Sequence, residues 1–373
     1  MKRLNICLIT LKFPPDSQDG EARVFRAYYD YLKSQGHNVK VITGKWQKKI
    51  KDPNIIQLKL ITKRFLWIPQ FNYKVALFLI KNKLNFDIIH GNGPKGTFPI
   101  ILANQKKFIS TIHDLGPFET SFHKIPLAKF FLKFIAKKST YITTVSEFVK
   151  TELKYFIPQI NSNIIFNFYN GIDSRFKPYP NEAIKIREEL NIDGPVILYI
   201  GRIASYKGVE DIIRAFRIAK EEIPDLNLVI GGLPDYSMEK SYHQWKNSFK
   251  DIKFIGFISD DEIPFYYTMG DIFITYSYAS EGFGLTPLEA IACGTPVICS
   301  SIMVFREILQ DSAIFVPPKN SKLLAKEIVK LLKDKELREG LIKKSQIYIQ
   351  KYRWDVIGNK LENLYYQFQK LNH

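Results

Sequence analysis

The segment Glu281-Gly-Phe-Gly-Leu-Thr-Pro-Leu-Glu289 sets two glutamates eight positions apart around a glycine-containing turn. An apolar strand pattern at 272–277 precedes it, and Ala-Ile-Ala-Cys-Gly-Thr-Pro-Val-Ile-Cys-Ser follows at 290–300. Pro287 suits the first position of a helix and Gly294 its end, so the sequence predicts a short helix over 287–293. N–H groups at a helix start have no partner inside the helix, and the helix dipole adds positive potential. We therefore expect a site for a phosphate that carries a group with hydroxyls.

The two glutamates are open to different interpretations. Thr286-x-x-Glu289 also fits a capping box, in which Glu289 would bond the N–H of the cap residue. Glu281 lies between an apolar strand and a Gly-x-Gly turn, where the sequence indicates no structural partner. Flexible backbone beside it suits close approach of a ligand. Glu281 is therefore the stronger candidate for ligand contact.

The segment 281–300 resembles the Glu-x7-Glu signature of retaining glycosyltransferase family 4, which has the GT-B fold. Further motifs follow the order of that family between about residues 4 and 366: His113-Asp114 after a strand, Asn170-Gly-Ile-Asp173, Gly201-Arg202 followed by Lys207-Gly208, and Tyr352-Arg-Trp354. The resemblance implies two Rossmann-like lobes whose parallel sheets face each other across a cleft. It also implies a C-terminal helix that crosses back to the first lobe.

The resemblance implies roles for the matching residues. Glu281 and His113 would contact the transferred sugar and are the expected catalytic residues. Glu289 would hold the ribose hydroxyls, while Arg202, Lys207 and the amides of 284–286 would hold the diphosphate. Between its first strand and first helix the family usually has paired glycines, of which this chain keeps only Gly20, with Asp19 in place of the other. The full set expected to bind the donor is Gly20, Arg202, Lys207, Gly282, Phe283, Gly284, Leu285, Thr286 and Glu289.

Two cations at a strand-to-helix turn also suit a diphosphate on chemical grounds. Arginine offers a fork of donors and lysine a mobile point charge. A leaving nucleoside diphosphate gains negative charge as the glycosidic bond breaks, so fixed donors there lower the barrier. The resemblance further implies retention of configuration, with attack from the leaving-group face and a phosphate oxygen taking the proton of the acceptor.

Length and composition indicate a globular protein of two domains. The chain has 373 residues, 46% of them hydrophobic, and no apolar run approaches the roughly 18–20 residues that cross a bilayer. The expected domains are an acceptor-side domain at 1–175, a nucleotide-sugar domain at 176–352, and a returning helix at 353–373. Cys7, Cys293 and Cys299 lie in apolar contexts without metal-ligand spacing, which indicates buried thiols in a reducing cytosol.

Apolar strand patterns alternate with helical ones, which is typical of βαβ units and parallel sheets. In the first half, strands are expected at 4–11, 38–43, 87–91, 108–113, 141–145 and 163–166. In the second half, they are expected at 195–201, 226–231, 253–255, 272–276, 295–300 and 313–316. Helices are expected at 209–223, 321–332 and 354–371, with a hinge in the range 170–194.

The positive charge is confined to the first half of the chain. Of a net +17, residues 1–175 carry 28 Lys/Arg against 11 Asp/Glu, whereas residues 176–373 carry 26 against 26. Such asymmetry predicts that one lobe faces a polyanion, either nucleic acid or an anionic membrane surface.

Two basic-aromatic segments could form that surface. In a helix over 126–138, Lys129, Lys133 and Lys137 form a stripe beside Phe130, Phe134 and Ile135. A second patch comprises Lys59, Lys63, Arg64, Phe65, Trp67 and Phe71. Like charges at i, i+4 repel each other, whereas anionic headgroups would stabilise them. A solvated face over ordinary core aromatics is the alternative. The resemblance favours a peripheral membrane enzyme on the cytoplasmic side.

The sequence predicts neither a metal site nor a cofactor. Ser259-Asp-Asp-Glu262 is interpreted as a capping box that starts a helix ending before Gly270, and the chain has no Asp-x-Asp. Neither Gly-x-Gly-x-x-Gly nor Gly-x4-Gly-Lys occurs. The absence of these two motifs argues against a nicotinamide enzyme and against a P-loop ATPase. The resemblance implies a hexosyltransferase with a nucleotide-sugar donor, a glycan or lipid-linked acceptor, and no nucleic-acid partner. The alternatives are an RNA-binding α/β protein that uses the basic lobe, and a GT-B phosphorylase or epimerase.

Overall fold

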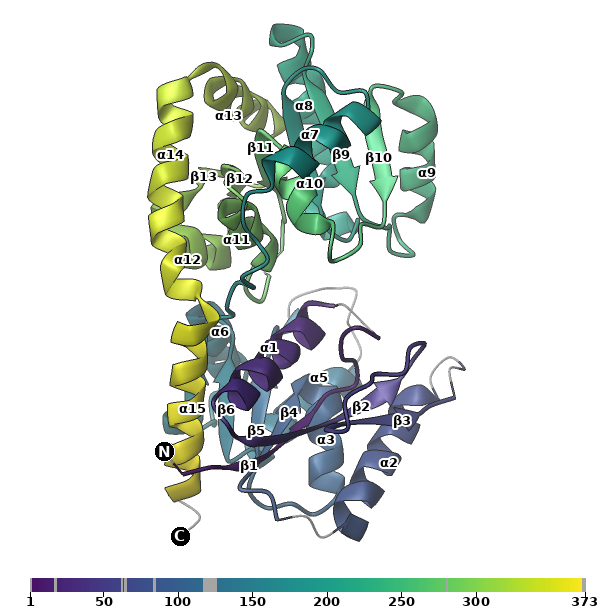
Figure 1. The fold of residues 1–373 in the computed structure, drawn as a ribbon, viewed down its shortest axis with the longest axis vertical. Coiled ribbons are helices and arrows are strands. Elements are labelled where there is room, and N and C mark those ends of the chain that lie inside the picture. The colour runs from purple at the N-terminus through teal and green to yellow at the C-terminus, as the bar shows by residue number, and fades with distance from the viewer. Residues whose placement is uncertain are drawn as a thin grey trace. The chain divides into compact units, whose positions relative to one another are not determined.

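A computed structural model gives the fold, which forms two compact units (Figure 1). It describes residues 2–16, 19–61, 63, 66–82, 85–116, 126–279 and 281–370, with the side chains of 126–128 excepted. Unit 1 comprises Met1–Gly171 and Trp354–His373, and unit 2 comprises Ile172–Arg353. The C-terminal segment thus returns to unit 1, and the structure divides the chain at 171/172 and 353/354, where we expected 175/176 and 352/353.

Unit 1 is built on a seven-stranded parallel sheet in the order β3-β2-β1-β4-β5-β6-β7. The strands are β1 (Asn5–Ile9), β2 (Asn38–Lys45), β3 (Ile55–Lys59), β4 (Ile88–Asn92), β5 (Ile109–Ile112), β6 (Tyr141–Thr144) and β7 (Ile165–Asn167). Six of these were predicted. β3 was missed because it is an edge strand with only one fully buried residue, Ile55, and so lacks a strong apolar pattern.

Helices cover both faces of this sheet. They are α1 (Gly20–Ser34), α2 (Trp67–Asn82), α3 (Gly93–Leu102), α5 (Pro126–Lys138), α6 (Glu147–Phe156) and α15 (Trp354–Lys370). α2, α3 and α5 pack in sequence on one face, whereas α1 packs against α15, which also contacts β4. Cys7 and Ile9 of β1 share a buried apolar core with Phe71 of α2. Burying such a side chain stabilises the fold by about 1.5–3 kcal/mol.

Buried polar contacts attach α15 to the sheet of unit 1. Tyr365 of α15 hydrogen-bonds to Nδ1 of His90 at 2.6 Å, and Nε2 of His90 bonds to the Thr111 hydroxyl at 2.7 Å. Burial, together with nearby His113, lowers the pKa of His90 to about 3, so its imidazole is neutral. A second contact joins His37 to Glu362 at 2.9 Å. The C-terminal helix is therefore an integral part of unit 1.

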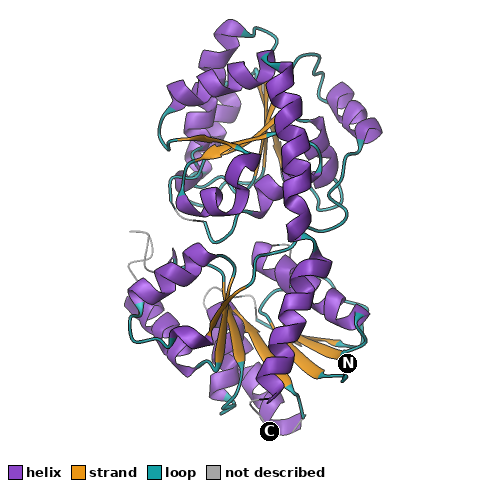
Figure 2. Cartoon of the chain, turned by 90° about the vertical axis from the view of Figure 1, so that its left-hand side faces the viewer, coloured by secondary structure: helices purple, strands orange, loops and turns teal. Residues whose placement is uncertain are grey.

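Unit 2 also contains a parallel sheet, and Figure 2 draws the strands in orange. This sheet has six strands in the order β10-β9-β8-β11-β12-β13. Its strands are β8 (Val196–Ile200), β9 (Asn227–Gly231), β10 (Ile252–Gly256), β11 (Ile272–Thr275), β12 (Val297–Ser300) and β13 (Ile314–Val316). Its helices are α7 (Pro180–Glu189), α8 (Val209–Glu222), α9 (Glu239–Ser248), α10 (Ile263–Met269), α11 (Leu285–Ala292), α12 (Met303–Leu309), α13 (Ser321–Lys333) and α14 (Lys335–Tyr348). α8 packs on α13, while α7 and α11 both pack on α10. Two parallel-sheet α/β units confirm the expected fold class.

The expected hinge range 170–194 includes the boundary between the two units at 171/172, and it also contains helix α7. Two local predictions were wrong. Helix α11 begins at Leu285, two residues before Pro287, because Gly284 adopts a left-handed φ of 92° and serves as its N-cap. The capping box of 259–262 does not start a helix: the Ser259 hydroxyl donates to Glu262 at 2.6 Å, but α10 begins only at Ile263.

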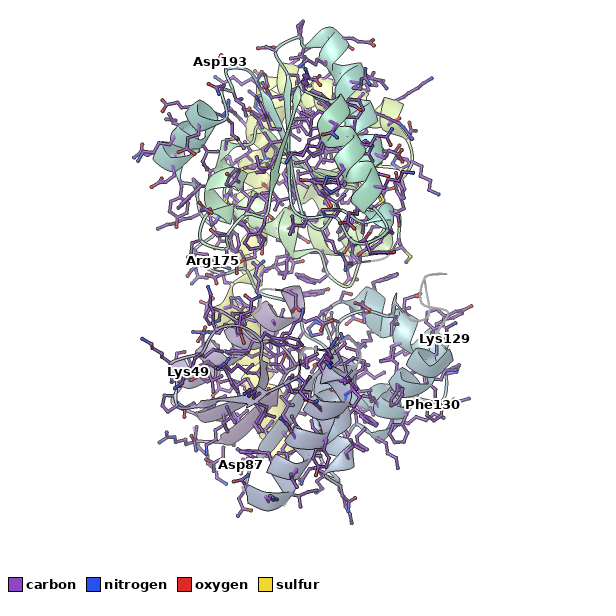
Figure 3. All side chains as sticks on the ribbon, turned by 90° about the vertical axis from the view of Figure 1, so that its right-hand side faces the viewer. Lys49, Asp87, Lys129, Phe130, Arg175 and Asp193 are labelled. Carbon is purple, nitrogen blue, oxygen red and sulfur yellow. The ribbon has the colours of Figure 1, made fainter. Side chains whose placement is uncertain are left out.

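The two basic-aromatic segments differ in the structure. Residues 126–138 form helix α5 as predicted, and the side chain of Phe130, which Figure 3 labels, is 63% exposed. Ile135, in contrast, is buried. In the second patch, Phe71 is a core residue and Trp67 packs edge-on against Trp46 at 5.4 Å.

Arg64 and Phe65 of that patch lie outside the described residues. The core position of Phe71 shows that this part of the patch was misassigned. Within the described ranges, no helix is long and apolar enough to cross a membrane.

Candidate functional site

Lys207 and Glu281 form the central contact of the candidate site in unit 2. The Lys207 ammonium lies 2.5 Å from Oε1 of Glu281, and the Ser277 hydroxyl donates to the same oxygen at 2.5 Å. Only 19% of the Lys207 side chain and 17% of the Glu281 side chain are exposed. We expected no structural partner for Glu281, and this was wrong. Lys207 was missed as a partner because it lies 74 residues earlier in the chain.

Arg202 lies close to this pair through Tyr206. A guanidinium nitrogen of Arg202 donates to the Tyr206 hydroxyl at 2.6 Å, and the Lys207 ammonium lies 5.3 Å from the Tyr206 ring. Burial alone would lower the pKa of Arg202, but Tyr206, Asp235 and Glu281 raise it above its ordinary value. The two cations predicted to hold a diphosphate are therefore grouped around one tyrosine, which we did not predict.

Buried contacts hold the turn that carries these cations. Tyr199, at the end of β8, donates its hydroxyl proton to the Arg202 carbonyl at 2.8 Å. Lys207 ends a short 3₁₀ helix, Ser205–Lys207, and Gly208 follows with a left-handed φ of 66°. A Cβ at Gly208 would overlap the carbonyl oxygen of Tyr276, so the turn packs directly on the end of β11. This close approach explains how Lys207 reaches Glu281.

The segment 282–286 leads from Glu281 into helix α11. Gly284 has a left-handed φ of 92°, and a Cβ there would lie 2.7 Å from the Phe305 ring. The N–H groups of Leu285 and Thr286 are in the first turn of α11, where they have no partner within the helix. Gly282, Leu285 and Thr286 are half-buried. The Phe283 side chain is instead a core group, packed edge-on against Tyr352 at 5.8 Å, so only its backbone can face a ligand.

Glu289 is almost entirely buried in the middle of α11. Only 1% of the residue is exposed, and it accepts a hydrogen bond from the Tyr267 hydroxyl at 3.1 Å. Thr286 is the second residue of the helix rather than its cap, so the capping box that was the alternative interpretation of Glu289 does not form. Tyr267 therefore holds the carboxylate that we expect to bind ribose hydroxyls.

In unit 1, His113 follows the carboxyl end of β5. Its Nε2 lies 2.6 Å from the side-chain oxygen of Asn92, which ends the neighbouring strand β4. Burial lowers the pKa of His113, while the carboxylates of Glu21, Asp114 and Asp19 oppose that shift. His113 is therefore predominantly neutral. Asn92 was not among the predicted residues, although its place at the end of a predicted strand is typical of ligand-binding positions in such sheets.

The β1–α1 segment contributes Gly20 and Asp19. Gly20 is the first residue of α1, and Asp19 is its N-cap, accepting a hydrogen bond from the Ala22 N–H at 2.9 Å. Lys12 pairs with the other carboxylate oxygen of Asp19 at 3.2 Å. Asp19, which stands where the resembled family usually has a glycine, thus caps a helix. Gly20 is exposed at the start of that helix.

The arrangement in unit 2 suits an anionic ligand that also carries hydroxyls. Arg202, Lys207 and the α11 N-terminus supply positive charge and N–H donors, and Glu281 supplies an acceptor for hydroxyls. Within the described residues, no group of three or more His, Cys, Asp or Glu is placed to hold a metal ion. The predicted residues Arg202, Lys207 and Glu281 lie together in unit 2, whereas His113 and Gly20 lie in unit 1.

Two family models match the chain: "Glycosyltransferase Family 4" over residues 19–176, and "Glycosyl transferases group 1" over residues 181–347. An uncharacterized glycosyltransferase of Methanocaldococcus jannaschii is 26% identical over 97% of this chain and 98% of its own length. An O-antigen chain mannosyltransferase of Salmonella typhimurium is 28% identical over 90% of this chain and 88% of its own. Among solved structures, Anabaena HepE in complex with UDP and glucose has a TM-score of 0.81 at 18% identity, covering 97% of this chain and 99% of that one.

Proposed function

Because the chain belongs to glycosyltransferase family 4, we propose that it transfers a hexose from a nucleotide-diphosphate sugar to a glycan or lipid-linked acceptor, with retention of configuration. The observation that carries the proposal is the Lys207–Glu281 contact beside Arg202 and the α11 N-terminus. In this proposal, the two cations hold the diphosphate, and the adjacent Glu281 carboxylate accepts hydrogen bonds from sugar hydroxyls.

Names of similar proteins support the donor class. The Anabaena structure contains UDP and glucose, and the Salmonella relative is a mannosyltransferase. We propose a UDP- or GDP-linked hexose as donor, with its diphosphate on Arg202, Lys207 and the amides of 284–286, and its ribose on Glu289.

The chemistry of these groups follows from their charge. When the glycosidic bond breaks, negative charge grows on the diphosphate, and Lys207 and Arg202 stabilise it more than they stabilise the bound donor. Glu281 contacts the sugar, and Lys207 and Ser277 hold the Glu281 carboxylate in one position. A phosphate oxygen takes the proton of the acceptor, and no divalent ion takes part. Transfer should therefore persist in the presence of a chelator.

A thermal-shift screen of UDP- and GDP-hexoses tests the donor proposal. A ligand at about 100 times its dissociation constant adds about 2.7 kcal/mol to the free energy of unfolding. Lys207→Met should abolish most of that gain, because a cation that contacts the diphosphate is lost. Lys335→Met is the matched control, because the Lys335 side chain is 77% exposed in the same unit and pairs with exposed Glu339 at 3.6 Å. If no nucleotide sugar stabilises the protein while RNA binds with a steep salt dependence, the RNA-binding alternative replaces the proposal.

We propose that the acceptor lies at an anionic membrane surface on the cytoplasmic side, contacted by unit 1. Helix α5 supports this, because Lys133, Lys137 and Phe130 are all exposed along it. Residues 1–175, most of unit 1, carry the whole positive excess, 28 Lys/Arg against 11 Asp/Glu. Each cation near an anionic surface contributes about 1 kcal/mol of binding.

Binding to phosphatidylglycerol vesicles tests this surface. The double variant Lys133→Glu/Lys137→Glu should weaken binding roughly thirtyfold or more, since two favourable contacts of about 1 kcal/mol each are lost. The control is Lys322→Glu/Lys326→Glu, which reverses two exposed lysines at the same spacing on α13 of unit 2. Equal losses in both double variants would show that net charge, and not α5, determines binding.

A further inference from the structure

The side chain of Asn92 does not make the hydrogen bond that is usual for its position. Asn92 ends β4 and is the N-cap of α3, a position where asparagine normally bonds a helix N–H. Here it makes no side-chain cap bond. Its amide instead bonds to Thr10, to the backbone of Glu21 and to His113. The amide thus joins the β1–α1 segment to the histidine after β5.

Two acceptors fix which way the Asn92 amide faces. Its Nδ2 lies 3.1 Å from the backbone carbonyl oxygen of Glu21, which can only accept. Nδ2 also lies 2.8 Å from the Thr10 hydroxyl, whose own proton goes to the Lys12 carbonyl at 2.9 Å. Thr10 therefore accepts from Asn92. With the amide reversed, its oxygen would face two acceptors, so the carbonyl side of Asn92 must face His113.

The orientation of this amide determines the tautomer of His113. Asn92 Oδ1 can only accept, and it lies 2.6 Å from Nε2 of His113, so Nε2 carries the proton. In a neutral imidazole, the other nitrogen then holds a lone pair. No hydrogen bond to Nδ1 of His113 is recorded from any residue in the described ranges of the chain. Nδ1 is thus an acceptor open to a ligand.

We propose that Asn92 is a positioning residue that holds His113 in the Nε2-protonated tautomer, so that Nδ1 accepts a hydrogen bond from a substrate hydroxyl. The role of that hydroxyl rests on the proposed sugar-transfer function. The tautomer has a chemical consequence, because a hydroxyl has a proton to donate and an ionised phosphate oxygen has none. His113 therefore recognises a sugar or acceptor hydroxyl and does not serve as a cation for the diphosphate.

The free protein, labelled with ¹⁵N-histidine, tests the tautomer without any substrate. Long-range ¹H–¹⁵N spectra distinguish a protonated ring nitrogen from one with a lone pair, and the His113 signals are assigned by their loss in His113→Gln. We expect a protonated Nε2 and an unprotonated Nδ1 at neutral pH, because burial lowers the pKa of His113 below that of an ordinary histidine. If Nδ1 is protonated at neutral pH, either in the neutral Nδ1 tautomer or in the imidazolium ion, the proposal is overturned.

Asn92→Asp tests the contribution of the amide. The new carboxylate would join Glu21 of α1, the N-cap Asp19 and Asp114 after β5, all of which favour the charged imidazole. The nearby His90 on β4 is neutral. The titration midpoint of His113 should rise by about one pH unit or more. Asn72→Asp is the matched control, because Asn72 is a buried asparagine on α2 of the same unit. An unchanged midpoint in Asn92→Asp, or an equal shift in Asn72→Asp, contradicts the assigned role.

Kinetics then separate this proposal from the proposed function. Once a donor has been found, kcat/KM of Asn92→Asp should fall roughly tenfold at pH values where its His113 is protonated, and should recover above that midpoint. A uniform loss at every pH would indicate a merely structural effect and overturn the positioning role. Failure of every nucleotide sugar to bind would refute the proposed function, whereas the spectra of the free protein decide the tautomer in either case.

Discussion

The Gly208→Ala substitution tests the close packing between the turn after β8 and the end of β11. Gly208 follows Lys207 and has a φ of 66°, and a Cβ there would overlap the carbonyl oxygen of Tyr276. Two other glycines of the same unit separate the cost of a left-handed φ from the cost of the overlap. Gly256 has a φ of 70° with nothing within 4 Å of an added Cβ, and Gly340 lies open in helix α14 without a left-handed φ. All three substitutions add the same methyl group.

The expected stability changes follow from these three environments. Gly340→Ala should stabilise unit 2 by about 0.5–1 kcal/mol, because alanine loses less entropy in a helix. Gly256→Ala should cost about 1–2 kcal/mol, the penalty for a left-handed backbone. Gly208→Ala adds a backbone overlap of about 1–3 kcal/mol to that penalty, for a total of about 2–5 kcal/mol.

Thermal unfolding followed by circular dichroism measures the series. For a domain of the size of unit 2, residues 172–353, about 1 kcal/mol moves Tm by about 2–4 °C. We expect Tm to rise by about 1–4 °C in Gly340→Ala, and to fall by about 2–8 °C in Gly256→Ala and by about 4–20 °C in Gly208→Ala. Gly208→Ala should also weaken nucleotide binding, because Tyr276 adjoins Ser277, which holds Glu281. Equal Tm losses at Gly208 and Gly256 would refute the close approach.

Three further outcomes are expected. Asp19→Ala should destabilise unit 1 by about 1 kcal/mol in urea unfolding, whereas Asp19→Gly should cost only a few tenths because glycine is a tolerated N-cap; equal losses would contradict the capping role. Between about pH 6.5 and the folded-state pKa of about 3, His90 takes up a proton only in the unfolded state. The free energy of unfolding should therefore fall as the pH decreases, by up to about 1.4 kcal/mol per pH unit. His90→Gln should flatten the dependence of Tm on pH between about pH 6.5 and 5. Tyr206→Phe removes the hydroxyl that holds Arg202 and should weaken nucleoside-diphosphate binding roughly threefold to tenfold by calorimetry, a loss that an unchanged affinity would disprove.

The candidate site was predictable where local pattern carries the information. Gly201-Arg202, Lys207-Gly208 and the 281–289 segment each follow an apolar strand, so their placement at strand ends follows from the sequence. The partners of these residues were not predictable. Ser277 and Tyr206 look like ordinary loop residues until the turn after β8 packs on the end of β11. From the sequence, Glu289 could bond either the N–H of a helix cap or the hydroxyls of a ligand. Only the packing of α10 on α11 shows that Tyr267 is one of its partners.

The α/β class and all but one of the strands in the described residues followed from the sequence by itself, because apolar periodicity repeats within a dozen residues. The two-domain division followed from chain length, and the GT-B arrangement from the resemblance to a known family. Tertiary structure decided which side chains meet: Lys207 with Glu281, Asn92 with His113, and His90 with Tyr365. Those pairs are separated by 74, 21 and 275 positions. They form because sheet order brings distant strand ends and helices together, and no local pattern encodes that order.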